Sequence, residues 1–318
     1  MFELALALIP AVVLLAAIYT ADTADREPWG LVLKCVGLGA LAIIPIAIIE
    51  GIADGVFSLT FGADTLSYLF ISTLIGVALV EEAFKMAAAL IPAWKSDQFD
   101  YVFDGIVYCV AAAVGYAAIE NVMYVCLADP SEMLDTAVVR ALMSVPSHVF
   151  DGILMGVFVG YAKLWKFRGN DGKKTAFLVL ALVAPMIEHC LYDFFASIEG
   201  DAASLFVIGM VFVEYVLAFV IVFKLRGKHD IAIPLPARTG APSAQEGLDG
   251  AAQGFAANRP LGGEQSEAPS FAGTSPQVVS PYATPERTAA GKRFCPECGA
   301  PQSPGNRFCP ECGTPQAR

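Results

Sequence analysis

Charged residues are scarce in this sequence, and their scarcity excludes most soluble folds. Only 16% of the 318 residues are Asp, Glu, Lys or Arg, whereas 56% are hydrophobic. This composition is typical of proteins that reside in a lipid bilayer. The net charge is −11, and the sequence contains neither a cluster of Lys and Arg residues nor a nucleic-acid recognition motif. We therefore expect a membrane protein that has no nucleic-acid partner.

The first apolar run, residues 2–20, lacks the basic segment that precedes the core of a signal peptide. Glu3 stands where such a segment would contain Lys or Arg. We therefore expect this run to be retained as a membrane span.

Seven apolar runs are long enough to cross a bilayer, which takes about 20 helical residues. The stretch 50–67 is interrupted by several Gly and Asp residues, and we expect it to form a loop or an interfacial segment. The sequence thus predicts an all-α integral membrane protein with a bundle of about seven transmembrane helices. The spans are expected near residues 2–20, 29–49, 68–92, 103–127, 139–164, 174–197 and 204–226.

Lys and Arg residues are distributed unequally between the two sides of the predicted bundle. Only Arg140 falls in the connections on one side, whereas eleven basic residues fall on the other. Positively charged connections tend to remain in the cytosol. We therefore expect a multi-pass protein of the cell membrane with its N-terminus outside and its C-terminus in the cytosol. The eleven residues are Arg26, Lys34, Lys95, Lys163, Lys166, Arg168, Lys173, Lys174, Lys224, Arg226 and Lys228.

The composition of the chain changes after the last predicted span. Residues 229–291 are rich in Pro, Gly, Ala, Ser and Gln and show no apolar periodicity. Such a segment cannot bury enough apolar surface to offset the entropy that is lost on folding, so we expect a disordered linker. The linker divides a membrane domain, residues 1–228, from a short C-terminal module, residues 292–318.

The C-terminal module contains two CPECG segments. Their cysteines have the spacing Cys-x2-Cys-x10-Cys-x2-Cys, which suits a tetrahedral structural zinc site. Disulfides and rubredoxin-type iron are the alternatives. A cytosolic tail disfavours disulfides, and we would expect a larger domain around such an iron site. We expect a zinc-ribbon that contacts an unknown cytosolic partner, with the ligands Cys295, Cys298, Cys309 and Cys312.

Ionisable residues recur inside the predicted spans, where each is costly and is by default a functional candidate. Glu81 and Glu82 precede Lys85 at i,i+4 and i,i+3 spacing, so Lys85 can neutralise one carboxylate. The other carboxylate would then be available as a general base. Glu120 and Asn121 lie in the outer half of the next predicted span.

Two histidines occur in later spans. His148 shares an i,i+4 stripe with three glycines, and small residues permit close packing of helices. We therefore expect His148 to face the interior of the bundle. His189 and Asp193 are also four residues apart and can meet on one helix face. The glycines of the stripe are Gly152, Gly156 and Gly160.

Each of these residues alone also has a structural explanation. A single His within a span can be a hydrogen-bonded packing residue. We expect Asp104 to cap a helix, Glu214 to link helices and Glu188 either to snorkel or to pair locally. The helical rise, however, places the glutamates and both histidines at similar depths in the outer half of the bilayer, where one cluster can form.

These segments resemble, in chain order, the motifs of PrsW-type proteases. VEEAFK resembles the EExxK motif, and FDGIVY and GYAAIEN resemble FDGIVYG and GFAxxEN. The two histidine segments resemble the later motifs, and the pattern is also similar to that of type II CAAX prenyl proteases. The similarity covers roughly residues 66–197. Cys109 replaces a Gly of the family pattern and Asp193 a frequent Asn, but neither change removes a proposed catalytic group.

The resemblance implies peptide hydrolysis inside the membrane. A glutamate would be the general base, His148 would hold the water, and His189 would be the oxyanion donor or acid. The family-type substrates are membrane-anchored anti-sigma factors that are cut on the extracytoplasmic side. The catalytic residues are then Glu81, Glu82, His148 and His189, and the supporting or substrate-binding residues are Lys85, Glu120, Asn121 and Asp193.

Three alternatives to this hypothesis concern the metal and the activity. Two His and a Glu could bind zinc, as in metalloproteases. The HExxH motif is absent, and the superfamily is usually described as glutamate-type, so we expect no metal in the membrane site. A proton- or ion-coupled transporter would also contain buried acids, but it does not account for the ordered motifs. An inactive scaffold that presents the zinc-ribbon is the third alternative.

Overall fold

The computed structural model describes residues 2–23, 25–228, 233, 293–294 and 301–302. The chain divides into two units, Met1–Pro234 and Leu235–Arg318. In the second unit the described residues form two short antiparallel strands, β1 (Arg293–Phe294) and β2 (Pro301–Gln302). The predicted zinc ligands Cys295, Cys298, Cys309 and Cys312, and the predicted linker apart from residue 233, lie outside the described residues.

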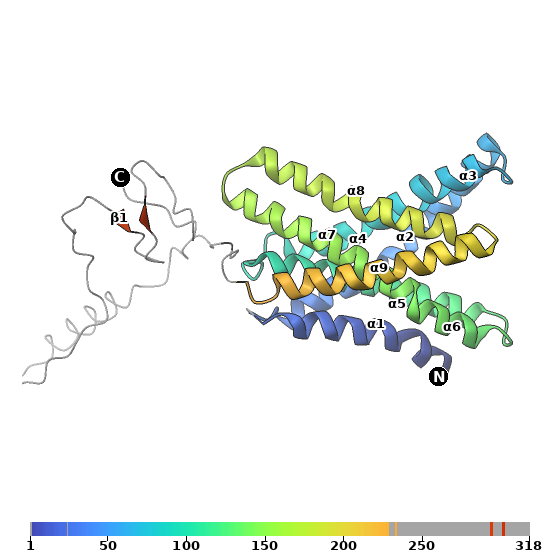
Figure 1. The fold of residues 1–318 in the computed structure, drawn as a ribbon, viewed down its shortest axis with the longest axis horizontal. Coiled ribbons are helices and arrows are strands. Elements are labelled where there is room, and N and C mark those ends of the chain that lie inside the picture. The colour runs from blue at the N-terminus through green and yellow to red at the C-terminus, as the bar shows by residue number, and fades with distance from the viewer. Residues whose placement is uncertain (1, 24, 229–232, 234–292, 295–300, 303–318) are drawn as a thin grey trace, which may run out of the picture. The chain divides into compact units, whose positions relative to one another are not determined.

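The first unit is a bundle of helices (Figure 1). In its described part, six helical segments are long and apolar enough to cross a membrane, with α6 and α7 counted as one. The predicted all-α membrane fold is therefore confirmed. The elements are α1 (Phe2–Ala21), α2 (Trp29–Phe61), α3 (Leu66–Ile71), the π-helical segment η1 (Ser72–Ala78), α4 (Leu79–Ala93), α5 (Val102–Leu127), α6 (Met133–Leu142), α7 (Ser144–Phe167), α8 (Asp171–Ala196) and α9 (Asp201–Leu225).

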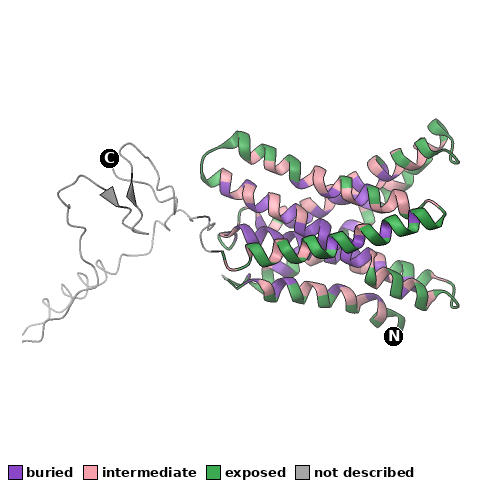
Figure 2. Cartoon of the chain, in the orientation of Figure 1, coloured by how far each residue is buried: buried purple, intermediate pink, exposed green. Residues whose placement is uncertain are grey.

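α5 is the central helix of the bundle. It packs against α1, α2, α4 and α7, and 18 of its 26 residues are buried. Figure 2 shows buried residues gathered along the inner helices and exposed residues along the outer ones. The outer faces are apolar, with Val12, Leu41 and Phe219 each more than 60% exposed. Large exposed apolar surfaces of this kind suit contact with lipid.

Glycines allow α5 and α7 to approach closely. A Cβ at Gly156 would collide with the backbone of Ile106, and a Cβ at Gly152 would lie 2.9 Å from the Cα of Val110. The predicted glycine stripe therefore does pack against a neighbouring helix. His148, one turn before Gly152, is buried as expected.

The region before the third predicted span differs from the expectation of a loop. α2 continues as a helix through residue 61, because glycine weakens a helix by only about 1 kcal/mol and does not by itself end one. The helix ends before Gly62, which has a φ of +79° that glycine adopts readily. The predicted span 68–92 is helical, but it consists of α3, η1 and α4 placed end to end.

The predicted span 139–164 is divided at Met143, which lies between α6 and α7. Pro146 explains the break, because a proline ring collides with the carbonyl group four residues earlier, here that of Leu142. In the first turn of α7 its missing N–H group has no helical partner to lose. His148 therefore lies near the start of α7.

Two carboxylates join helix ends on the side where α5 begins. Asp104 accepts a hydrogen bond from the Tyr101 N–H group at 2.6 Å, which confirms its predicted role as a helix cap. In the connection between α1 and α2, the Glu27 carboxylate accepts a hydrogen bond from the Tyr108 hydroxyl group, and the Glu27 backbone carbonyl accepts one from the Tyr19 hydroxyl group. Burial, and then the nearby Asp104 carboxylate, raise the pKa of Glu27 to about 10.

The close contact between α5 and α7 can be tested with Gly156→Ala. The added methyl group has no space beside Ile106, and such overpacking costs about 1–3 kcal/mol. We expect a lower unfolding temperature of the purified chain in detergent. Gly209→Ala in α9 is the matched control, because a Cβ there meets no atom within 4 Å. Equal unfolding temperatures for the two variants would contradict the close contact.

Candidate active site

α4 contains a buried cluster of charges near its start. The Lys85 ammonium group lies 2.8 Å from Glu81 Oε2, 2.8 Å from Glu82 Oε1 and 3.1 Å from His148 Nδ1. All four residues are at most 5% exposed. The expectation that Lys85 neutralises one carboxylate was incomplete, because its ammonium group contacts both. An ammonium group has three donor hydrogens, so these three acceptors satisfy it.

The π-helical segment η1 ends just before the two glutamates. At its end the Leu79 N–H group donates to the carbonyl of Leu74, five residues earlier. A π turn contains more residues than an α turn, so it changes which faces the following residues occupy. Such segments are frequent at functional sites. Sequence analysis missed η1, because its residues differ in no obvious way from an ordinary apolar helix.

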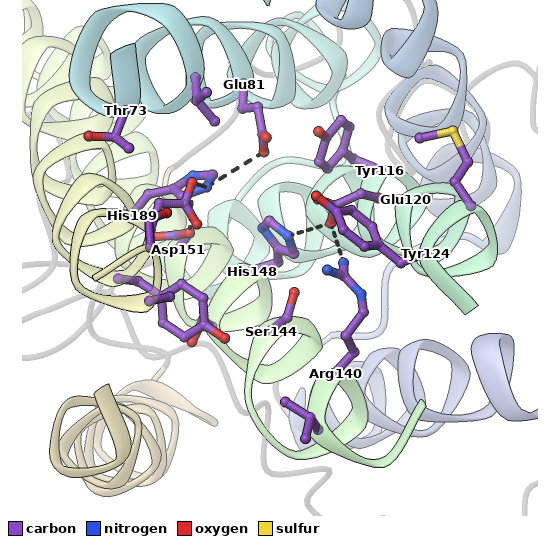
Figure 3. Close-up of a pocket in the computed structure, with 18 of the residues that line it drawn as sticks. Thr73, Glu81, Tyr116, Glu120, Tyr124, Arg140, Ser144, His148, Asp151 and His189 are labelled. Carbon is purple, nitrogen blue, oxygen red and sulfur yellow. Dashed lines mark hydrogen bonds and ion pairs between the residues drawn. The ribbon is translucent and has the colours of Figure 1, made fainter. Parts of the chain in front are cut away.

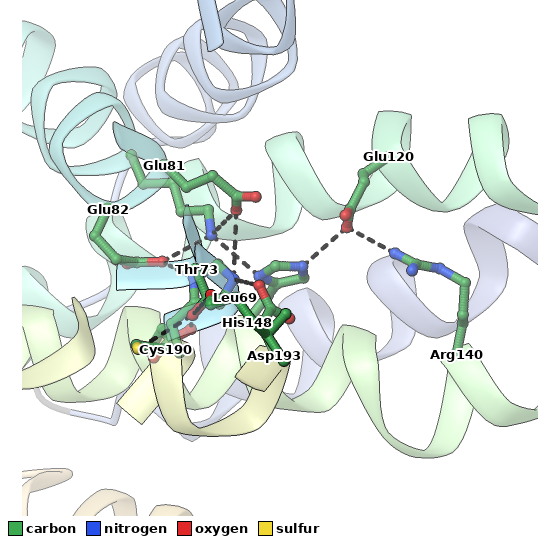
Figure 4. A network of polar contacts seen from close by, with 12 residues as sticks. Leu69, Thr73, Glu81, Glu82, Glu120, Arg140, His148, Cys190 and Asp193 are labelled. Atoms are coloured by element: carbon green, nitrogen blue, oxygen red, sulfur yellow. Dashed lines mark hydrogen bonds and ion pairs between the residues drawn. The ribbon is translucent and has the colours of Figure 1, made fainter. Parts of the chain in front are cut away.

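The hydrogen bonds of His148 indicate its tautomer. Its Nε2 lies 2.9 Å from Glu120 Oε2, and its Nδ1 faces the Lys85 ammonium group (Figure 4). Because an ammonium group can only donate, Nδ1 must accept. The ring proton is therefore on Nε2 and is donated to Glu120.

His189 lies among four carboxylates, of which Asp151 is described below. Its Nδ1 is 2.9 Å from Glu82 Oε1, and its Nε2 is 3.2 Å from Asp193 Oδ2 and 3.8 Å from Glu81 Oε2. The expected meeting of His189 and Asp193 on one helix face is therefore present. The two imidazole rings of His189 and His148 are perpendicular, with centroids 5.4 Å apart. The four residues predicted as catalytic thus lie together.

Glu120 is held from a second direction by Arg140, on α6. Arg140 Nη2 donates to Glu120 Oε2 at 2.6 Å, and Arg140 Nε donates to Asn121 Oδ1 at 2.8 Å. Asn121 also donates to the Ala7 carbonyl, and it is not among the described residues that line the cavity discussed next. From the sequence, Arg140 was used only to predict the orientation in the membrane, so its position in the site was not predicted.

A cavity of about 910 Å³ opens beside this cluster. Figure 3 shows Glu81, His189, His148 and Glu120 around it, with Arg140 below Glu120 in this view and joined to it by a dashed line. Glu82 and Lys85 are absent from its described lining. Glu81 is therefore the member of the glutamate pair that a molecule in the cavity can reach.

The cavity opens at one end of the bundle. Its lining comes from the last turns of α5 and α8, the first turns of α7, and α6, together with residues of α2, η1 and the start of α4. The basic residues that end α7 and α9 lie at the opposite end of those helices. The cavity is thus on the side that the distribution of basic residues assigned to the outside.

Three lining residues were not anticipated from the sequence: Glu50, Tyr116 and Asp151. The Tyr116 ring stands edge-on to the His148 imidazole, with centroids 5.7 Å apart. Asp151 Oδ2 lies 3.9 Å from His189 Nδ1. Asp151 follows His148 by three residues on α7, so the two residues lie on one helix face. This spacing was the signal from which Asp151 could have been predicted to lie in the site.

Glu81, His148 and His189 could hold a metal ion, since one donor atom from each lies within 4.8 Å of the others. Two imidazoles and one carboxylate form a ligand set of catalytic zinc. Each imidazole also has a carboxylate at one ring nitrogen, Glu120 for His148 and Glu82 for His189, as zinc-binding histidines usually do. The residues therefore fit a zinc ion, provided that Lys85 releases His148 Nδ1.

Comparisons with known proteins identify the family. The profile of the PrsW family intramembrane metalloproteases matches residues 27–224, and that of a zinc-ribbon domain matches residues 292–316. Protease PrsW of Oceanobacillus iheyensis is 34% identical over 185 residues, which cover 58% of this chain and 78% of that protein. Protease PrsW of Clostridioides difficile is 33% identical over 195 residues, which cover 61% and 79%. No solved structure matches the chain significantly.

The family match contains all of the predicted catalytic residues, and the second match contains the four tail cysteines. A zinc-ribbon at the C-terminus is therefore confirmed as a domain, which favours zinc in the tail. The family description names a metalloprotease, which the expectation of a metal-free membrane site did not anticipate. The chain belongs to the PrsW family of intramembrane metalloproteases: it is a multi-span membrane peptidase with a zinc-ribbon domain, and its substrates are membrane proteins.

Proposed function

We propose that Glu81 is the general base that activates the water for peptide hydrolysis. The observation that supports this role is that Glu81 alone of the glutamate pair lines the cavity, beside His148 and His189. A base must lie within hydrogen-bond reach of the proton that it removes. The Lys85 ammonium group would compensate the negative charge of the Glu81 carboxylate until Glu81 accepts the proton from water.

His189 is proposed as the donor that stabilises the oxyanion and protonates the leaving amine. Glu82 accepts a hydrogen bond from Nδ1 and so fixes the ring, which leaves Nε2 between Asp193 and Glu81. In its protonated form the imidazole would then present an N–H group toward the cavity. Before substrate binds, Asp193 would accept the hydrogen bond from this N–H group. The substrate carbonyl would then take the place of Asp193 as the acceptor.

His148 is proposed to position the water, with Glu120 and Arg140 as positioning residues. Glu120 accepts from both His148 and Arg140, so its charge is compensated and it can hold the ring of His148. If a zinc ion is bound, Glu81, His148 and His189 would hold it, and Glu81 would then be a ligand and not the general base. The zinc would lower the pKa of a bound water and polarise the peptide carbonyl.

The proposed substrates are single-pass membrane proteins that are cut in the outer half of the bilayer. The cavity lies at the end of the bundle opposite the basic residues, and positive connections favour the cytosol. Membrane-anchored anti-sigma factors are the substrates that the resemblance implies. For this chain, the proposal that it cleaves such factors is supported by the resemblance alone. This proposal is preferred to a transporter or an inactive scaffold because the groups that hydrolysis requires lie together around one cavity.

The proposed base can be tested with Glu81→Gln, which keeps the size of the side chain and removes its basicity. Loss of a general base lowers a rate by about 10²- to 10⁴-fold. We expect a loss of at least about 10²-fold in cleavage of a single-span reporter by the full chain in lipid vesicles. His148→Ala and His189→Ala should have similar effects, and the combined loss should be less than additive, because the residues act as a unit.

Glu199→Gln is the matched control for these variants, because Glu199 is exposed and lies outside the cavity lining. It should cleave the reporter at the original rate. Membrane insertion should be equal for all variants, as measured by their yield in washed membranes. Full activity of Glu81→Gln together with both histidine variants would refute this site.

The orientation predicts opposite labelling of two connections. In a variant with Cys126→Ser, which removes an exposed cysteine near the site, we would replace Asp129 or Asn170 by Cys. A membrane-impermeant maleimide applied to intact cells should label the cysteine at position 129 and leave that at position 170 unlabelled until the cells are opened. The reverse result would put the cavity on the cytosolic side.

The tail is proposed to fold around one zinc ion, independently of the membrane domain. Metal supplies most of the folding free energy of so small a module. We expect the full chain to contain one zinc that is lost in the double variant Cys295→Ser, Cys298→Ser, and removal of residues 292–318 should leave the bundle folded. Disulfides among these cysteines in freshly isolated protein would contradict the assignment. A zinc equivalent that persists in the double variant and disappears in His148→Ala would belong to the membrane site.

A further inference from the structure

Four buried carboxylate oxygens receive no hydrogen bond from a basic side chain, a Ser, Thr or Tyr hydroxyl group or a backbone N–H group among the described residues. They are Oδ1 of Asp151, both oxygens of Glu188, and Oε1 of Glu214. These residues come from α7, α8 and α9. Glu188 is hydrogen-bonded through its side chain to both of the other acids, so the three form one group. We call Asp151, Glu188 and Glu214 the acidic triad.

The acidic triad adjoins the catalytic cavity. Asp151 and Glu188 line it. Asp151 Oδ2 lies 3.9 Å from His189 Nδ1, and Figure 3 shows the Asp151 and His189 side chains next to each other. Glu214 is reached through Ser147, another lining residue, whose hydroxyl donates to Glu214 Oε2 at 2.6 Å. A peptide group that meets His189 would therefore have Asp151 and Glu188 within reach of its neighbouring side chains. Glu214 does not line this cavity and is linked to it through Ser147 and Glu188.

The two cationic side chains of the site, Lys85 and Arg140, bind groups outside the triad. Lys85 is satisfied by Glu81, Glu82 and His148, and Arg140 binds Glu120 and Asn121. A carboxylate that is withdrawn from water without a partner is costly, because the lost hydration must be replaced by a charge or by donors. The triad therefore lacks, in the described part of the chain, the positive group that its oxygens require.

We propose that the acidic triad is a substrate subsite that binds the cationic side chain of a Lys or Arg residue next to the scissile bond. This inference rests on the proposed function of the cavity. The arrangement at Lys85 is a precedent within the same molecule, since one ammonium group there is bound by acceptors from more than one helix. The four oxygens, which no donor outside the triad contacts among the described residues, offer comparable acceptors to an ammonium or guanidinium group.

The charge of the whole cavity supports the same preference. Eight of its lining residues are Asp or Glu, and one is Arg. A cleft that is lined by one sign of charge raises the local concentration of oppositely charged groups. Acidic side chains near the scissile bond should therefore be excluded, and basic side chains should be favoured.

The test uses the full chain in lipid vesicles and a series of single-span reporters. Mass spectrometry first locates the cleavage site in a reporter without charges in its span. Each of the three positions on either side of that site is then replaced in turn by Lys, Arg, Met, Gln or Glu. At one or more positions we expect kcat/KM for Lys and Arg to exceed that for Met and Gln by about tenfold or more, since hydrogen bonds to charged groups are worth that much. Glu at the same position should give the lowest value.

Glu188→Gln and Glu214→Gln test whether the triad causes the preference for Lys and Arg. Each should reduce the advantage of Lys over Met at that position to within about threefold, since each removes one charged partner. The readout is the ratio of Lys to Met cleavage within one variant, so a general loss of activity that affects both reporters equally leaves it unchanged. Yield in washed membranes, as above, shows whether the variants are folded. Glu199→Gln, as before, should retain the full preference.

A measurement without catalysis completes the test. The inactive Glu81→Gln chain keeps the triad, so it should retain the Lys reporter in vesicles more tightly than the Met reporter. Equal cleavage of Lys and Met reporters by the original chain, or a preference that survives in both Gln variants, would overturn the subsite while the proposed function stands. If the original chain cleaves none of the reporters, the proposed function fails, and the subsite fails with it.

Discussion

The buried Lys85 ammonium group is the interaction on which the arrangement of the site depends. It joins α4 to α7 by binding two glutamates and one histidine, and the same Glu82 then holds His189 of α8. Removal of one partner from a buried charge cluster leaves the others uncompensated, which costs about 3–5 kcal/mol. The cluster thereby fixes the tautomer of His148 and separates an accessible glutamate from an inaccessible one. The same contacts hold the helices in register around the cavity.

Much of this arrangement could be predicted from helical spacing. Glu81, Glu82 and Lys85 lie within one turn, and the glycines that follow His148 lie on its face, so local geometry alone brings these groups together. The direction of His148 followed from the small size of Gly152 and Gly156, because only close packing uses such a stripe. Apolar length indicated the spans, because a lipid-exposed helix needs an apolar surface over its whole length.

The remainder depends on contacts between helices, which no spacing within one helix specifies. Arg140 reaches Glu120 only because Pro146 divides the predicted fifth span and turns α6 into a separate helix. Glu188 was expected to snorkel or to pair locally, yet it belongs to a group from three helices. The continuation of α2 past Gly51 and Gly55 was missed, because a helix that packs against its neighbours tolerates residues of low helix propensity.

The length of α2 has a consequence for the surrounding bilayer. Its 33 residues give a helix of about 50 Å, whereas the hydrocarbon core is about 30 Å thick, so even a strongly tilted α2 must leave the apolar layer. Its last turns, which are joined to α3 by a hydrogen bond between Asp54 and Tyr68, therefore reach the headgroup region. Glu50, in the cavity wall, precedes these turns and would lie near the boundary between acyl chains and water. Acyl-chain length would then determine how much of that wall is hydrated, which makes lipid composition a means of controlling this enzyme.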